Sequence, residues 1–360
     1  MESSQLLQQA LQEARQASSQ GHAEQAVFHA SNAAGLALDL GDELGHAEAQ
    51  SLLVLHLFSL GRFADALQHG HLALQAWQRL EQHDRVCETQ LRLALSLSEL
   101  GIHLRASALA RAAQMLAQQH GLDSHAHQAL ALLGGLCGRA GDVDDGELLL
   151  LQALSRASET QDQATRTTVL NTLLALLLEG VEQARAAGDG ARLAALAQRL
   201  RRHAGLAWAH CTQEPNLFRR TVLRGNVAAA LAVCGQTQEA LGLQRACAQE
   251  AAEAGFRVFE MRSRSRLATL LLDAGDSDAA VAEVDRMESL VRGESNAGAE
   301  LELLTLRARV AEMAGQMEAA RDLRAQAEAR RQAHAQLQAA IRRQVEAEAA
   351  AVLDLLAPGP

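Results

Sequence analysis

At 360 residues, with 48% hydrophobic and 21% charged residues, the chain is long and apolar enough to fold around a core, which excludes disorder as its overall state. All 33 basic residues are arginine, and this excludes a lysine Schiff base, a P-loop lysine and a kinase lysine. The formal net charge of −10, without basic runs or a membrane-length apolar window, disfavours nucleic-acid and membrane partners. Five scattered cysteines without a CxxC pair are typical of reduced thiols, so we expect a cytoplasmic protein.

A glycine followed five positions later by a small residue recurs through the first half of the chain. In LGRFADALQHGHLALQAW, residues 60–77, the pair is Gly61 and Ala66. At a fixed 40-residue period the same pattern gives Gly21 with Ala26, Gly101 with Ala106, and Gly141 with Gly146. Glycine supplies the left-handed backbone of a tight turn, and the small residue lets two helices approach closely. We therefore predict a row of helix hairpins, because one hairpin cannot bury its own apolar face.

The pattern continues in the second half after an irregular stretch. Regular pairs return as Gly235 with Ala240, Gly275 with Ala280, and Gly315 with Ala320. Between the two blocks, Gly188 lies 47 residues from each neighbouring glycine, which predicts longer helices or an insertion there. We expect a repeat array over residues 1–330, with irregular units around 155–235.

The last repeat runs into a long predicted helix. Residues 331–360 are expected to extend this helix and end in a short tail. Its broken apolar stripe is formed by Leu323, Leu337, Ile341, Val345 and Val352. Two interpretations stay open: the helix caps the final repeat, or it forms a coiled coil, either with a second copy in a homodimer or with a partner.

These repeats resemble tetratricopeptide (TPR) repeats in the roughly 40-residue variant of bacterial regulators. First helices such as ETQLRLALSLSELG and LRGNVAAALAVCG carry apolar residues every three to four positions. The resemblance implies an all-α, right-handed α-solenoid of about eight helix hairpins with a long C-terminal helix. The chain is also similar to the TPR segments that precede diguanylate cyclase domains in bacterial signalling proteins, although it contains no GGDEF signature.

No pattern in the sequence predicts catalysis or a bound cofactor. His69 and His71, like His125 and His127, are two residues apart and point to different faces of a helix. The segment HAGLAWAHC, residues 203–211, is the best metal candidate, but it lacks ligand spacing of the CxxC or HExxH kind. We expect Trp208 within it to be a core residue. The prediction is a protein that is not an enzyme and carries no metal or cofactor.

The remaining candidate site is a surface. The TPR resemblance implies that first helices line a concave groove in which a partner peptide lies, with asparagines that hold its backbone. Helical spacing places Arg219 with Asn226 on one side of their helix, and Arg262 with Arg266 and Thr269 on one side of the next first helix. Arg309 extends this surface, and the resemblance implies the backbone-holding role for Asn226 and, one unit earlier, Asn171. Because an arginine fork suits carboxylates, we expect an acidic or C-terminal partner segment. The alternative is that these arginines are solvated and paired with the chain's own glutamates.

Two functions are compatible with this pattern. The first is a protein-interaction scaffold or adaptor in bacterial intracellular signalling, with a partner segment in the groove. The second is a ligand-gated sensor that binds a small peptide or metabolite and regulates a separate effector through a change of solenoid pitch. The sensor predicts a buried polar cluster in the irregular stretch between Gly141 and Gly235.

Overall fold

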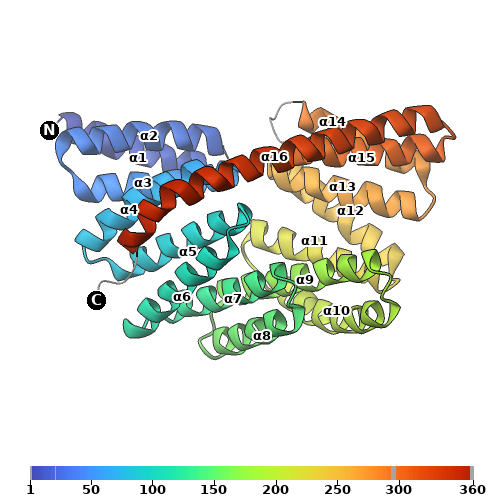
Figure 1. Cartoon of the computed structure of the whole chain (residues 1–360), viewed down its shortest axis with the longest axis horizontal. Helices are drawn as coiled ribbons and strands as arrows, with labels where there is room; N and C mark the ends of the chain where they lie inside the picture. The colour runs from blue at the N-terminus through green and yellow to red at the C-terminus, as the bar shows by residue number, and fades with distance from the viewer. Residues whose placement is uncertain (1, 21, 293–296, 357–360) are drawn as a thin grey trace. The chain divides into compact units, whose positions relative to one another are not determined.

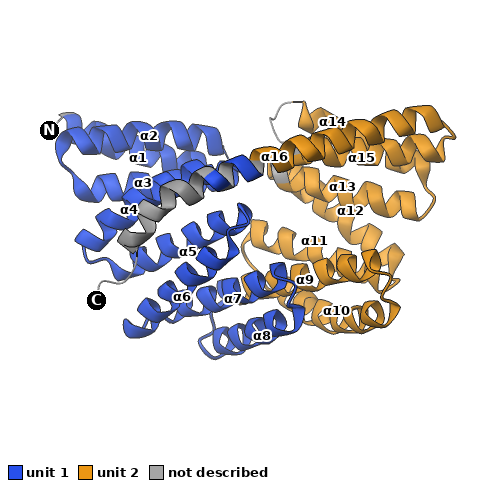
Figure 2. Ribbon diagram, in the orientation of Figure 1, with its two compact units in different colours: residues 1–165, 339–360 blue, residues 166–338 orange. Residues whose placement is uncertain are grey.

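The computed structural model describes residues 2–20, 22–292 and 297–356. Within these ranges the chain forms sixteen helices and no strand (Figure 1). It divides into two compact units, residues 1–165 with 339–360 and residues 166–338 (Figure 2). Each unit is described by itself.

The first unit contains four helix pairs. Their bounds are α1 (Glu2–Ser19), α2 (Ala23–Leu40), α3 (Glu43–Ser59), α4 (Phe63–Arg79), α5 (His83–Glu99), α6 (His103–Gln119), α7 (Asp123–Arg139) and α8 (Val143–Glu159). Each helix packs against the next one along the chain, and the first helices also touch one another, α1 with α3, α3 with α5 and α5 with α7. This is the stacking expected of a helical-repeat protein.

The second unit repeats the arrangement with one irregular pair. Its helices are α9 (Gln163–Ala186), α10 (Gly190–Cys211), α11 (Leu217–Val233), α12 (Thr237–Glu253), α13 (Arg257–Asp273), α14 (Ser277–Val291) and α15 (Ala297–Met313). The long helix α16 (Met317–Leu356) belongs to the second unit up to residue 338, and its remainder belongs to the first. The 47-residue spacing is explained by α9 and α10, which have 24 and 22 residues where α8 and α11 have 17. The prediction of longer helices is confirmed for this pair.

The repeated glycines close the turns within the pairs. Gly61 has a φ of 72°, and the turn is held by bonds from its N–H to Phe58 and from Arg62 N–H to Leu57. This is a left-handed helix end, for which glycine has no Cβ penalty. The glycines therefore have the predicted role.

Small residues stand where paired helices cross. Ala66 and Ala106 are fully buried. In the fourth pair, a methyl group added at Gly134 would lie 2.9 Å from the carbonyl oxygen of Gly146 and 2.8 Å from Leu150. The crossing thus has no room for a larger residue, which is why the small residue recurs.

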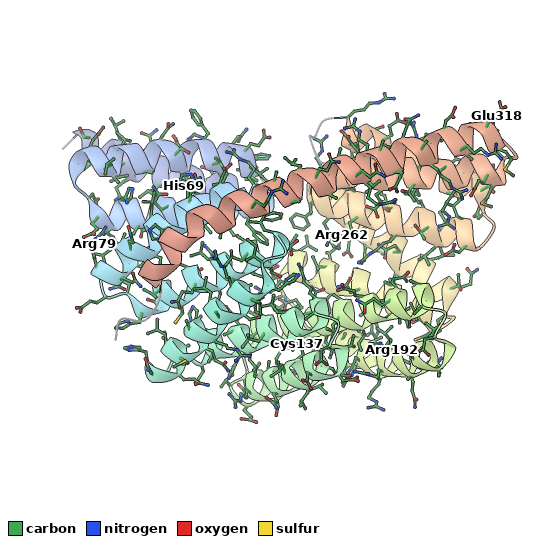
Figure 3. All side chains as sticks on the ribbon, in the orientation of Figure 1. His69, Arg79, Cys137, Arg192, Arg262 and Glu318 are labelled. Atoms are coloured by element: carbon green, nitrogen blue, oxygen red, sulfur yellow. The ribbon has the colours of Figure 1, made fainter. Side chains whose placement is uncertain are left out.

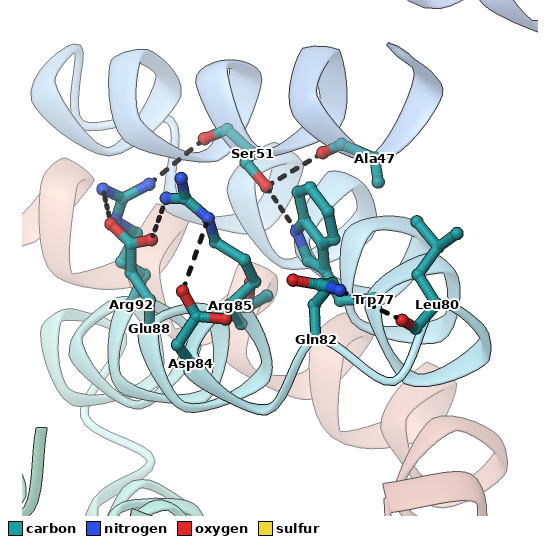
Figure 4. Close-up of polar contacts among 10 residues, drawn as sticks. Ala47, Ser51, Trp77, Leu80, Gln82, Asp84, Arg85, Glu88 and Arg92 are labelled. Carbon is teal, nitrogen blue, oxygen red and sulfur yellow. Dashed lines mark hydrogen bonds and ion pairs between the residues drawn. The ribbon is translucent and has the colours of Figure 1, made fainter. Parts of the chain in front are cut away.

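Hydrogen bonds to Ser51 connect three helices of the first unit, and one of them comes from the buried Trp77 (Figure 4). Trp77 on α4 donates from Nε1 to the Ser51 hydroxyl of α3 at 2.9 Å. Arg92 on α5 donates to the Ser51 carbonyl oxygen at 3.3 Å and to Glu88 at 2.6 Å. Neighbouring pairs are therefore joined by directional bonds as well as by apolar contacts.

The long C-terminal helix is confirmed, since α16 runs unbroken over 40 residues. Of its predicted apolar stripe, Leu323 is partly buried and Leu337 is 56% exposed. The side chains of Ile341, Val345 and Val352 lie outside the described residues. Among the described helices, none is long and apolar enough to cross a membrane.

Four histidines lie on α3 and α4 of the first unit: His46, His56, His69 and His71. Burial lowers the pKa of each. The Gln50 side-chain amide lies between two of these histidines. Its nitrogen is 3.1 Å from His46 Nε2, and its oxygen accepts a hydrogen bond from His69 Nδ1 at 2.7 Å. His46 Nε2 is an acceptor in this arrangement, so the chain of bonds requires a neutral ring.

We expect Ala106→Leu to overpack the crossing of α5 and α6 and to cost about 1–3 kcal/mol of unfolding free energy. Hydrogen exchange of the α5 and α6 amides would measure the loss locally. Leu104→Ala is the control, since Leu104 is 90% exposed on the same helix. Equal protection in both variants would contradict the crossing described here.

We expect the first unit to lose stability between pH 7.5 and pH 5.5. Unfolded histidines, with pKa values of about 6.5, take up protons that the folded ones resist, so stability is full above that pH and falls below it. Trp77 is the first unit's tryptophan, so its fluorescence in a Trp208→Phe variant reports that unit. The melting temperature should drop by about 2–4 °C or more. Gln in place of His46 and His69 should reduce this drop in melting temperature. A wild-type melting temperature that is the same at both pH values would refute the prediction.

Candidate functional site

Three of the predicted residues form one chain of hydrogen bonds on the first helices of the second unit. Arg266 on α13 donates to Asn226 Oδ1 at 2.9 Å, and Asn226 on α11 donates to Asn171 Oδ1 on α9 at 2.7 Å. We call the surface formed by Asn171, Asn226, Arg262 and Arg266 the first-helix face. Its polar groups are fixed across three successive repeats.

A glycine permits this approach of α11 and α13. A Cβ at Gly225 would lie 3.3 Å from the Phe259 ring and 3.8 Å from Arg266 Nη1. Asn226, the next residue, is only 7% exposed and needs both of its bonds to offset burial. The pair Gly225–Asn226 therefore sets the position of the Arg266 guanidinium.

Arg262 and Arg266 form no ion pair with any carboxylate in the part of the chain that the structure describes. Arg262 is exposed on α13 (Figure 3), whereas Arg266 is partly buried and bonded only to a neutral amide. Burial lowers the pKa of the Arg266 guanidinium, and the positive charge of Arg262 lowers it further, while Glu302 opposes the change. The face thus holds two positive charges without a direct counter-charge.

Two other predicted arginines are paired within the unit. Arg219 on α11 donates to Glu214 through Nη2 at 3.3 Å, and Arg309 on α15 donates to Asp273 at 2.6 Å. The alternative interpretation, that the arginines pair with the chain's own carboxylates, therefore holds for Arg219 and Arg309. It does not hold for Arg262 or Arg266.

Aromatic side chains lie beside the first-helix face. Phe218 contacts Phe256 and Phe259 edge to face, with ring centroids 5.2 and 6.3 Å apart. Phe218 is 49% exposed, although aromatic residues make up only 2% of the chain. An apolar group of a ligand can pack against these rings, of which Phe259 lies three residues before Arg262 on α13.

A pocket of about 390 Å³ opens on the other side of α13. Its lining combines hydroxyls, leucines and charges from α13, α15 and α16: Ser265, Thr269, Gly298, Leu301, Glu302, Thr305, Leu306, Arg309 and Arg331. Ser265 donates its hydroxyl proton to Glu302 at 2.5 Å. The predicted residues Thr269 and Arg309 thus belong to this pocket.

A buried polar cluster lies in the irregular stretch. The Thr167 hydroxyl of α9 donates to Glu214 and lies 2.8 Å from His210 Nε2 on α10. Burial alone would raise the pKa of Glu214, but bonds from Thr167, Asn216 N–H and Arg219 hold it below its usual value. This cluster lies where the sensor hypothesis predicts one. The Glu214 carboxylate, three residues beyond the end of α10, carries no sequence signal.

The metal candidate at residues 203–211 finds no support in the geometry. In the described ranges, no three His, Cys, Asp or Glu side chains are grouped to hold a metal ion. Cys211 donates to the Arg220 carbonyl oxygen at 3.4 Å, and burial raises its pKa. The expectation that Trp208 is a core residue is wrong, since it is 40% exposed where α10 turns its indole outward.

All five cysteines are free thiols. Burial raises the pKa of Cys87 to about 11 and that of Cys247 to about 12. Such thiols stay protonated at neutral pH and are poor nucleophiles.

No family model and no curated protein matches this chain. Solved structures do share its fold. The Rap conjugation gene regulator of plasmid pLS20, in complex with the Phr* peptide, matches with a TM-score of 0.59 and 13% identity over 85% of this chain and 77% of that one. A Rap protein complexed with competence and sporulation factor matches at 0.56 and 14% over 97% and 99%. The fold is thus the expected TPR-like α-solenoid.

We expect Asn226→Ala to lower the unfolding free energy of the second unit by about 1–3 kcal/mol, because Arg266 and Asn171 both lose a partner. Arg262→Ala, which removes an exposed side chain, should change it by less than about 0.5 kcal/mol. Hydrogen exchange of the α11 and α13 amides measures both. Equal effects would mean that the bonded chain contributes nothing.

Proposed function

We propose that this chain is a peptide-binding helical-repeat module and that its first-helix face holds an acidic or C-terminal segment of a partner. The observation that carries the proposal is the pair Arg262 and Arg266, which have no carboxylate partner among the described residues. The two Rap structures of similar fold are complexed with a peptide and with competence and sporulation factor, and this supports a peptide as the ligand class.

Each part of the face has a chemical role in this proposal. Arg262 and Arg266 offer guanidinium N–H groups that can bind a carboxylate through two parallel bonds. Asn171 is half-buried on α9 and offers its amide to a peptide backbone, while the buried Asn226 holds Asn171 and Arg266 in place. Phe218 provides an apolar surface at the edge of the face. Together they suit a short segment that combines a backbone, a negative charge and an apolar side chain.

In the cell, this activity corresponds to a non-catalytic adaptor of bacterial intracellular signalling. This setting is the one that the resemblance to TPR segments preceding diguanylate cyclase domains implies. The net charge of −10 makes a positive face a selective feature, since most of the surface repels acidic ligands.

A second candidate function is the ligand-gated sensor. The buried cluster of Thr167, His210 and Glu214 favours it, because a polar network inside an irregular repeat can have two discrete arrangements. Under this proposal, ligand binding changes the hydrogen exchange of α10, which carries His210. Under the adaptor proposal, α10 is unchanged and protection appears on the first helices that carry the face.

The proposal is tested with a pool of synthetic random heptapeptides captured on the immobilised protein and sequenced by mass spectrometry. We expect the wild type to enrich peptides with Asp, Glu or a free carboxyl end, and Arg262→Glu to reduce that enrichment at least about fivefold. A second pool with amidated ends separates terminal from side-chain carboxylates.

Arg245→Glu is the matched control, because Arg245 is also exposed and without a described ion pair but lies on the second helix α12. It should enrich the same peptides as the wild type. If Arg262→Glu also does so, or if the wild type enriches no peptides, the first-helix face is not the binding site.

A further inference from the structure

The centre of α13 separates two surfaces of opposite charge. Its consecutive residues Ser265 and Arg266 point to different neighbours: Ser265 bonds Glu302 on α15, and Arg266 bonds Asn226 on α11. Positive charge from Arg262 and Arg266 therefore lies toward α11, and the negative charge of Glu302 lies toward α15. A segment that crosses α13 meets both charges in a fixed order.

The negative side of α13 is the pocket of about 390 Å³. Glu302 is exposed there and accepts a bond from the neutral Ser265 hydroxyl. Among the described residues it forms no ion pair, and the charge of Arg266 acts on it without a direct contact. The two arginines of the lining form ion pairs with other carboxylates, Arg309 with Asp273 and Arg331 with Glu328. The charge that the pocket presents to a ligand is therefore that of Glu302.

The rest of the lining suits a long aliphatic side chain that ends in a donor. Leu306 is almost fully buried and Leu301 partly so, and they form an apolar wall. Thr269 and Thr305 place hydroxyl acceptors at the same opening. Long basic side chains bury their apolar stem against such a wall and keep their charged head among the polar groups at the opening.

We propose that this pocket binds a lysine or arginine side chain of the partner segment, with Glu302 as its counter-charge. The inference rests on the proposed function and deepens it. The bound segment then carries an acidic group over Arg262 and Arg266 and a basic residue over Glu302, at a fixed separation. This order of charges sets the direction in which the segment lies across α13, since the reversed segment meets like charges at both points.

The test uses the same random heptapeptide pool, captured on the wild type and on Glu302→Arg. Among peptides that the wild type retains, we expect Lys or Arg to be enriched at a fixed spacing from the acidic group. Glu302→Arg should abolish the enrichment of the basic residue at that spacing and retain that of the acidic group. Asp285→Arg, an exposed charge reversal on the second helix α14, should behave as the wild type.

A peptide from the selection then allows a double-mutant cycle by fluorescence anisotropy. Glu302→Gln and a Lys→Gln change in the peptide should each weaken binding by about fivefold, and the two together by no more than either alone. Additive losses would overturn the pairing.

The outcomes separate this inference from the proposed function. If the wild type enriches acidic groups without a basic residue, or if Glu302→Arg keeps the basic residue, the pocket assignment is wrong and the first-helix face stands. If no peptides are enriched, both are wrong. Circular dichroism of each variant confirms that the helices are intact.

Discussion

The close crossing of the two helices in each pair is the constraint on which the structure depends. At Gly134 and Gly146, and around Ala66 and Ala106, the helices leave no room for more than a small side chain. A helix pair with only small residues at its crossing buries little apolar surface by itself. Its leucines must therefore pack against the next pair. Repetition of one crossing thus produces both the stack of pairs and the row of first helices that forms the first-helix face.

The irregular pair α9 and α10 interrupts this regularity and adds polar groups to the interior. Glu214 is a fully buried carboxylate, which costs free energy unless each lone pair is satisfied. Thr167, Asn216 and Arg219 supply those bonds, and His210 completes the network. The network lies next in sequence to α11, so the repeat that departs from the pattern adjoins the one that carries Asn226.

On the first-helix face, local stability and binding make opposite demands. A partly buried guanidinium is best stabilised by a carboxylate, yet Arg266 has a neutral amide in that place. The missing counter-charge lowers stability and leaves binding capacity for an external one. Under the proposed function, the positive charge on one side of α13 and Glu302 on the other distinguish the order of charges in a bound segment.

Composition and the 40-residue spacing determined the helix pairs, because a turn glycine and a small crossing residue are local requirements that appear directly in the residue pattern. Helical periodicity also placed Arg262 and Arg266 on one side of their helix, and the TPR resemblance implied that Asn171 and Asn226 line the same groove. Only the tertiary structure decided which arginines remain unpaired: the partners of Arg219 and Arg309 lie on turns or neighbouring helices whose approach is set by packing. The same holds for Thr167 with Glu214, 47 residues apart, and Ser265 with Glu302, 37 residues apart, since no local signal specifies contacts across repeats.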